Sequence, residues 1–214
     1  RQSVFVRKAM SRFFGVNRDI FLRTVFLVAV NLFFTSFGAR QGDLILSVNT
    51  LLLTFYTIFS YVMDGFAFAA EALCGKAYGA GDGPRFRRIC RRLAFWGLLT
   101  VALFTLCYAA GGRWFLGLLT DEAAVVDAAM PYFPWALLIP LSGVAAFIYD
   151  GIFIGITATR GMLVSSCIAS AGFFVIYVSL GSVLHNHALW LALVVYLLTR
   201  GVVQKIYLDR VCRI

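Results

Sequence analysis

Five ionisable residues lie inside long apolar stretches of this 214-residue chain: Arg23, Asp64, Glu71, Asp150 and Arg200. Charged side chains are costly in lipid, and those found there usually serve an ion pathway, a substrate pathway or a charged partner. Asp64 and Glu71 are seven positions apart, which places both carboxylates on one face of a helix. Three carboxylates in such a setting could bind a cation or exchange a proton, with Arg200 and Arg23 as counter-charges. A static cluster of ion pairs that joins helices is the alternative.

The two aspartates occur in similar short segments. Residues 61–66 read YVMDGF and residues 147–152 read FIYDGI, so an Asp-Gly pair follows aromatic and aliphatic residues in both. A glycine at this position permits a close approach between helices or a local break. The similarity favours treating Asp64 and Asp150 as parts of one site between helices.

The composition excludes an ordinary water-soluble domain. Hydrophobic residues make up 61% of the chain and charged residues 14%, with a mean hydropathy of +0.87. The net charge of +9 is accompanied by no pattern typical of nucleic-acid binding, so no nucleic-acid partner is expected. Five cysteines are scattered without a CxxC pair, which argues against a disulfide framework and a zinc site. The sequence predicts an all-α membrane protein without a metal or an organic cofactor.

Hydropathy predicts six membrane spans. Residues 161–199 form an uncharged run of 39 residues, about 58 Å as a helix, which must cross a hydrocarbon layer of about 30 Å twice. Its break is expected within residues 181–187. Residues 1–19 are predicted to form a basic amphipathic helix on the cytoplasmic membrane surface or a plain charged linker. The spans are expected at 20–38, 44–75, 88–112, 128–157, 161–182 and 188–209, which together form one lobe over residues 20–212.

The fourth predicted span contains Pro131, Pro134 and Pro140. Each proline removes a backbone donor, so this helix is expected to bend.

The loops indicate the orientation. If the amino end is cytoplasmic, 17 of the 19 Lys and Arg residues lie in or towards cytoplasmic segments, and only Arg40 and Arg113 lie outside. The positive-inside rule therefore predicts that both termini are cytoplasmic.

No enzymatic arrangement is apparent. The glycine-rich segment GKAYGAGD lacks the spacing of a phosphate-binding loop, and the spans contain no Ser-His or zincin pattern. A non-enzymatic protein is expected.

Four segments resemble, in order, the DinF-like branch of the multidrug and toxic compound extrusion family. They are NRDIFLRTVFL (17–27), GARQGD (38–43), DGFAFAAEALCGKAYGAGD (64–82) and YDGIFIGITATRGM (149–162). The resemblance implies the second six-helix lobe of a twelve-helix transporter, with a preceding six-helix lobe as its partner. It also implies export of cationic or amphipathic drugs or metabolites across the plasma (inner) membrane, in exchange for H⁺ or Na⁺.

The same resemblance bears on the site. A sister branch of the family has an acidic cation site on the seventh, eighth and tenth helices. In this chain Asp64 and Glu71 lie on the corresponding eighth helix and Asp150 on the tenth, whereas the seventh carries Asn31 as its strongly polar mid-span residue.

Two other functions remain open from the sequence. One is a non-transporting membrane subunit or truncated relic whose charged cluster is structural. The other is a flippase of related fold for lipid-linked sugars, which would call for a more cationic central cavity than Arg23 and Arg200 provide.

Overall fold

The computed structural model describes residues 7–211, and these residues form helices joined by short turns. Six segments are long and apolar enough to cross a membrane, with α4, a 3₁₀ turn and α5 together making the fourth. The predicted all-α class with six spans is therefore confirmed. The elements are α1 (Arg7–Ala39), α2 (Asp43–Gly79), α3 (Gly83–Leu119), α4 (Ala123–Ala129), the 3₁₀ turn (Met130–Tyr132), α5 (Phe133–Gly155), α6 (Arg160–Leu184) and α7 (Asn186–Val211).

Several helices are longer than the spans predicted from hydropathy. α2 has 37 residues, about 55 Å at 1.5 Å per residue, so it extends beyond the hydrocarbon layer. α3 also has 37 residues, but it is kinked at Gly112, where the backbone is not helical. The turn between them is set locally: Gly81 adopts a positive φ of 70°, and the Asp82 side chain accepts a 2.9 Å hydrogen bond from the Arg85 backbone N–H.

The segment expected as a separate linker continues into the first span. Residues 7–19 form the first turns of α1 without a break, and residues 1–6 lie outside the described part of the chain. A location on the membrane surface stays a prediction. Between α6 and α7 the chain turns at His185, whose φ is 47°, within the expected 181–187.

The three prolines occupy different settings. Pro131 lies in the 3₁₀ turn and Pro134 in the first turn of α5, where no helical hydrogen bond is lost. Pro140 is the one inside α5, which continues through it. The chain thus changes from α-helix to 3₁₀ helix at residues 130–132, which include Pro131, the first of the three prolines at which a bend was expected.

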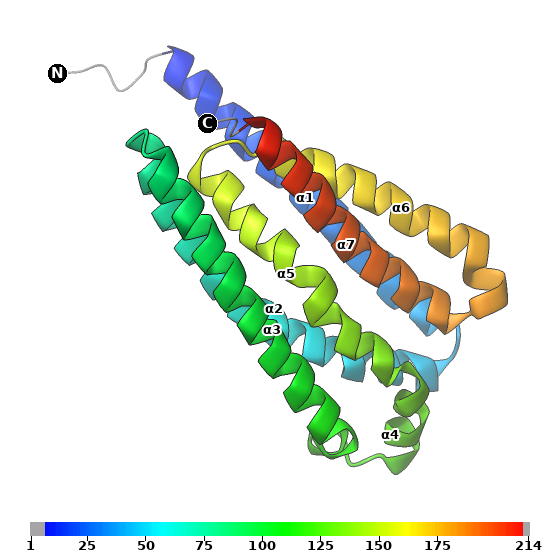
Figure 1. Cartoon of the computed structure of the whole chain (residues 1–214). Helices are drawn as coiled ribbons and strands as arrows, with labels where there is room; N and C mark the ends of the chain where they lie inside the picture. The colour runs from blue at the N-terminus through cyan, green and yellow to red at the C-terminus, as the bar shows by residue number, and fades with distance from the viewer. Residues whose placement is uncertain (1–6, 212–214) are drawn as a thin grey trace.

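α5 lies in the middle of the bundle (Figure 1). It packs against α2 and α3 on one side and α7 on the other, and α1 and α6 form the far flank. α1 begins and α7 ends at the same end of the bundle, where the α2–α3 and α5–α6 turns also lie (Figure 1). We call this the terminal end.

At the opposite end a buried amide pair joins α2 to α7. Asn49 and Asn186 donate to each other at 2.8 and 2.9 Å, and Trp190 Nε1 donates to Asn49 Oδ1 at 3.0 Å. Each amide thus donates one N–H and accepts through its oxygen. These bonds fix the register of α2 against α7.

Glycines bring α2 and α5 into backbone contact. A Cβ added at Gly151 would overlap the backbone of Ala67, and one at Gly155 would overlap the backbone carbonyl of Glu71. A Cβ at Gly75 would lie 2.8 Å from the Gly155 carbonyl oxygen. Small residues at such crossings let helices pack closely in lipid, so Asp150, next to Gly151, is held against α2.

Gly151→Ala should destabilise the protein, because the new methyl group meets backbone atoms that cannot move independently. Overpacking of this kind costs about 1–3 kcal/mol. The matched control is Gly65→Ala in the other Asp-Gly pair, Asp64-Gly65. A Cβ at Gly65 meets nothing within 4 Å, and alanine favours the helix. Thermal unfolding in detergent should show a lower midpoint for Gly151→Ala only. Equal midpoints would contradict the close crossing.

Candidate functional site

Asp150 is the centre of the buried polar cluster. Its Oδ2 accepts from Arg200 Nη2 at 2.6 Å and also from Arg23 Nη2, while its Oδ1 accepts from Gln204 Nε2 at 2.6 Å. Asp150 lies on α5, Arg23 on α1, and the other two donors on α7. One carboxylate therefore links three helices that are distant in the sequence.

The two arginines differ in their surroundings. The Arg200 side chain is 3% exposed, whereas that of Arg23 is 20% exposed. Arg200 also lies over the ring of Tyr196, with its Cζ 5.6 Å from the ring centroid, a cation–π contact that strengthens away from water. Arg200 is thus fixed within the core, and Arg23 approaches the same carboxylate from the edge.

A cavity of about 130 Å³ brings the predicted acidic residues together. Arg23, Asp64, Glu71 and Asp150 line it, and Phe68 is also part of its wall. Asp64 and Glu71 are half-buried, and neither forms an ion pair with another residue in 7–211. The cavity therefore combines a carboxylate bound by two arginines with two carboxylates that form no ion pair inside the described part of the chain.

Two predicted residues lie elsewhere. Arg200 does not line the cavity, because its guanidinium reaches Asp150 from the α7 side. Asn31 is exposed, its amide donates to the Leu27 carbonyl of its own helix at 3.0 Å, and it is not among the lining residues. The structure thus unites Asp64, Glu71, Asp150 and Arg23, but not Asn31.

The cluster around Asp150 is not fully hydrogen-bonded. Four buried polar atoms there have no partner among the described residues: Arg23 Nε, Arg200 Nε, Gln204 Oε1 and Tyr196 OH. A buried polar group without a partner costs about 1–3 kcal/mol, and natural proteins contain few of them. Four such atoms therefore surround one carboxylate at the centre of the cluster.

The face of α2 that leads to the cavity alternates aromatic and acidic residues. Tyr61, Asp64, Phe68 and Glu71 follow one another at helical spacing, and Tyr61 and Phe68 are 73% and 69% exposed. Carboxylates attract a cation, and aromatic rings bind one through their faces. We call these four residues the acid–aromatic face.

Comparison with known proteins identifies the family. The MatE family model matches residues 20–180 of the chain. The chain belongs to the MatE family. It is also 39% identical over 190 residues to DNA damage-inducible protein F of Escherichia coli (strain K12), a match that covers 89% of this chain. The chain spans about two fifths of the length of that relative, 41%. The resemblance seen in the sequence is confirmed, and the MatE chain is a multi-pass membrane protein.

Gln204 is a site residue of the MatE chain that sequence reasoning missed. It is four positions after Arg200, so both side chains lie on one face of α7, and both donate to Asp150. This pair of polar residues in an apolar helix is visible in the sequence, but nothing there identifies Asp150 as the shared acceptor.

Asp150→Asn should strongly lower the stability of the MatE chain, because two arginines lose their anion. Breaking a buried ion pair from one side costs about 3–5 kcal/mol. Adding Arg200→Gln should cost less than the sum of the two single changes, since the arginine no longer needs a partner. Thermal unfolding of the four proteins in detergent measures this coupling.

Arg113→Gln is the control for these variants. It breaks the Arg113–Asp127 pair, 2.5 Å long, whose side chains are 62% and 59% exposed, and should change the midpoint little. Strict additivity of Asp150→Asn and Arg200→Gln would contradict the pairing.

Proposed function

We propose that this chain is one lobe of a membrane antiporter that exports organic cations or amphipathic compounds in exchange for protons. The observation that carries the proposal is the acid–aromatic face, which leads to a carboxylate already held by two arginines. Membership of the MatE family supports transport. Within this proposal the protein is a transporter and not an enzyme.

Protons fit the site better than sodium. A hard cation needs several oxygen ligands at once. The Asp150 oxygens already accept from Arg23, Arg200 and Gln204. Among residues 7–211 no three His, Cys, Asp or Glu side chains converge as ligands of one ion. Asp64 and Glu71, which have no ion-pair partner among the residues that the structure describes, are better suited to exchanging protons one at a time.

We propose that Arg23 is the counter-charge that moves during transport. When Asp64 is ionised, Arg23 shares the cavity with the carboxylates of Asp64, Glu71 and Asp150. Protonation of Asp64 removes one of these attractions and leaves the ion pair of Arg23 with Asp150. Arg23 belongs to α1, which packs mainly on α6 at the flank of the bundle. Protonation of Asp64 would thus bias the position of α1, which is how a proton can shift a conformational equilibrium.

The same face supports a cationic substrate. An organic cation at Tyr61 and Phe68 would be attracted by ionised Asp64 and Glu71, and loading of protons on these carboxylates would weaken that attraction. Proton and cation therefore compete, as exchange requires.

The proposed transporter contains a second lobe and lies in the plasma (inner) membrane. The family model and the 41% coverage of the relative support a preceding six-helix lobe as the partner, with the carboxylate cavity between the lobes. The basic residues support a plasma (inner) membrane location with the terminal end in the cytoplasm.

Asp64→Asn in the complete two-lobe transporter should abolish exchange while leaving the fold intact, because asparagine keeps the shape but cannot release a proton. In proteoliposomes with a pH-sensitive dye inside, ethidium added to the wild type should move protons across the membrane. Asp64→Asn should reduce that signal at least about a hundredfold, the lower end of the loss expected when a general acid–base group is removed. The control is Asp43→Asn, an exposed carboxylate at the start of α2 outside the cavity.

Two results would contradict this. If the Asp64→Asn variant moved protons as well as the wild type, the Asp64 carboxylate would have no role in coupling proton movement to export. A signal that follows an imposed Na⁺ gradient and not the pH gradient would replace the proton by sodium.

Single cysteines test the orientation in a protein whose native cysteines are replaced. Ala80→Cys in the α2–α3 turn and Ser182→Cys near the end of α6 are both at exposed positions. A membrane-impermeant thiol reagent applied to intact cells should label Ser182→Cys and spare Ala80→Cys. The reverse pattern would overturn the cytoplasmic assignment of the terminal end.

A further inference from the structure

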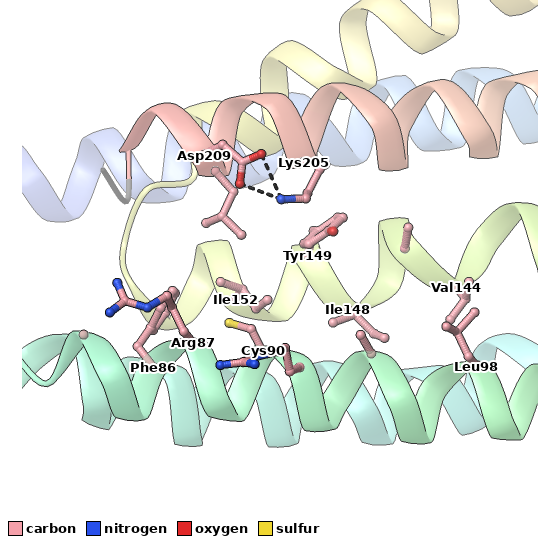
Figure 2. A pocket seen from close by; sticks show the side chains of 15 residues that line it. Phe86, Arg87, Cys90, Leu98, Val144, Ile148, Tyr149, Ile152, Lys205 and Asp209 are labelled. Carbon is pink, nitrogen blue, oxygen red and sulfur yellow. Dashed lines mark hydrogen bonds and ion pairs between the residues drawn. The ribbon is translucent and has the colours of Figure 1, made fainter. Parts of the chain in front are cut away.

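A larger cavity lies away from the carboxylate site, between α3, α5 and α7 towards the terminal end (Figure 2). Its volume is about 590 Å³, within the usual range of ligand pockets, and it shares no lining residue with the cavity of Asp64. Apolar side chains from α3 and α5 form most of its wall, among them Leu98, Val144 and Ile148 (Figure 2).

The charged residues of this cavity are all at one end. Arg87 and Arg91 lie on the first turns of α3, and Lys205 and Asp209 on the last turns of α7. Lys205 Nζ donates to both carboxylate oxygens of Asp209, at 2.6 and 2.8 Å (Figure 2). Three cations against one anion leave a net charge of +2 at this rim.

The apolar part of the wall lies deeper in the bundle. Ala94 and Leu98 follow the arginines along α3, and Val144 and Ile148 face them from α5. From Arg87 to Leu98 the helix rises about 16 Å, roughly half of a 30 Å hydrocarbon layer. The cavity thus has the polarity and the depth of one lipid leaflet.

We propose that this cavity binds an anionic phospholipid from the leaflet at the terminal end. The headgroup phosphate lies at Arg87 and Arg91, since guanidinium groups recognise phosphate through several N–H donors. One acyl chain runs along Ala94, Leu98 and Ile148. We call this the lipid site.

A lipid explains both halves of the wall. Free phosphate would leave the apolar half without a partner. A helix of the other lobe would cover this basic rim and would have to present an anionic group to Arg91 at the same depth. An anionic lipid supplies the charge and the apolar chain in the observed order, and fills the space between α3 and α7.

Native mass spectrometry of the full chain in detergent tests the lipid site. Phosphatidylglycerol and phosphatidylcholine with the same acyl chains are added separately, and the lipid-bound fraction is measured. The wild type should retain phosphatidylglycerol preferentially. Arg87→Gln with Arg91→Gln should lower that retention at least about tenfold, because both guanidinium groups contact the phosphate directly through charge-assisted hydrogen bonds.

A control variant removes the same charge at the same end. Lys76→Gln with Arg210→Gln alters two exposed residues outside this cavity and should change retention less than about twofold. Equal losses in the two double variants would show general surface electrostatics and overturn the proposal. Equal retention of both lipids by the wild type would overturn it as well.

A second variant tests the apolar half without changing charge. Ala94→Trp fills the cavity and should lower phosphatidylglycerol retention several-fold, whereas Ala102→Trp, at an exposed position of α3 outside the cavity, should not. Unchanged retention in Ala94→Trp, together with displacement of the lipid by inorganic phosphate, would make this a phosphate site and overturn the lipid assignment. A change of oligomeric state in the arginine variant, with lipid retention unchanged, would make it a protein interface and overturn it equally.

Discussion

The ion cluster at Asp150 is the interaction on which the arrangement of this lobe depends. One carboxylate on α5 accepts from Arg23 of α1 and from Arg200 and Gln204 of α7. In lipid, no water replaces these partners, so the three helices must present them at the same depth. The close crossing of α2 and α5 at Gly151 then brings Asp64 and Glu71 to the same cavity.

The cluster has a buried side at Arg200 and a partly exposed side at Arg23. Arg200 is buried beside Tyr196, whereas Arg23 is partly exposed on a helix at the flank of the bundle. In the proposed function, the structural and functional roles that the sequence left as alternatives belong to different residues. Arg200 and Gln204 hold Asp150, and Arg23 faces the carboxylates of α2 across the cavity.

Hydropathy and helical periodicity were sufficient to predict the six spans and the shared face of Asp64 and Glu71, and the similarity of the two Asp-Gly segments predicted the association of Asp150 with Asp64. They could not predict which arginine meets which acid, because periodicity defines a face and not the helix that packs against it. Asn31 illustrates the limit: a polar side chain in a span can bond to its own helix, here to the Leu27 carbonyl. The Asn49–Asn186 pair was missed for the same reason, since its partners are 137 residues apart.

The most direct test of the account is a dipolar-recoupling measurement by solid-state NMR, with carbon-13 in the aspartate carboxyls and nitrogen-15 in the arginine guanidinium groups. The measurement uses a protein that carries Arg18→Gln and Arg113→Gln, which removes the ion pairs of Asp19 and Asp127. In it we predict one strongly dephased carboxyl signal that disappears in Asp150→Asn, persists in Asp64→Asn and is dephased more slowly in Arg200→Gln, because two guanidinium groups contact it. Loss of that signal in Asp64→Asn, with no change in Asp150→Asn, would show that the arginines bind Asp64 of α2 and not Asp150. That result would contradict the account.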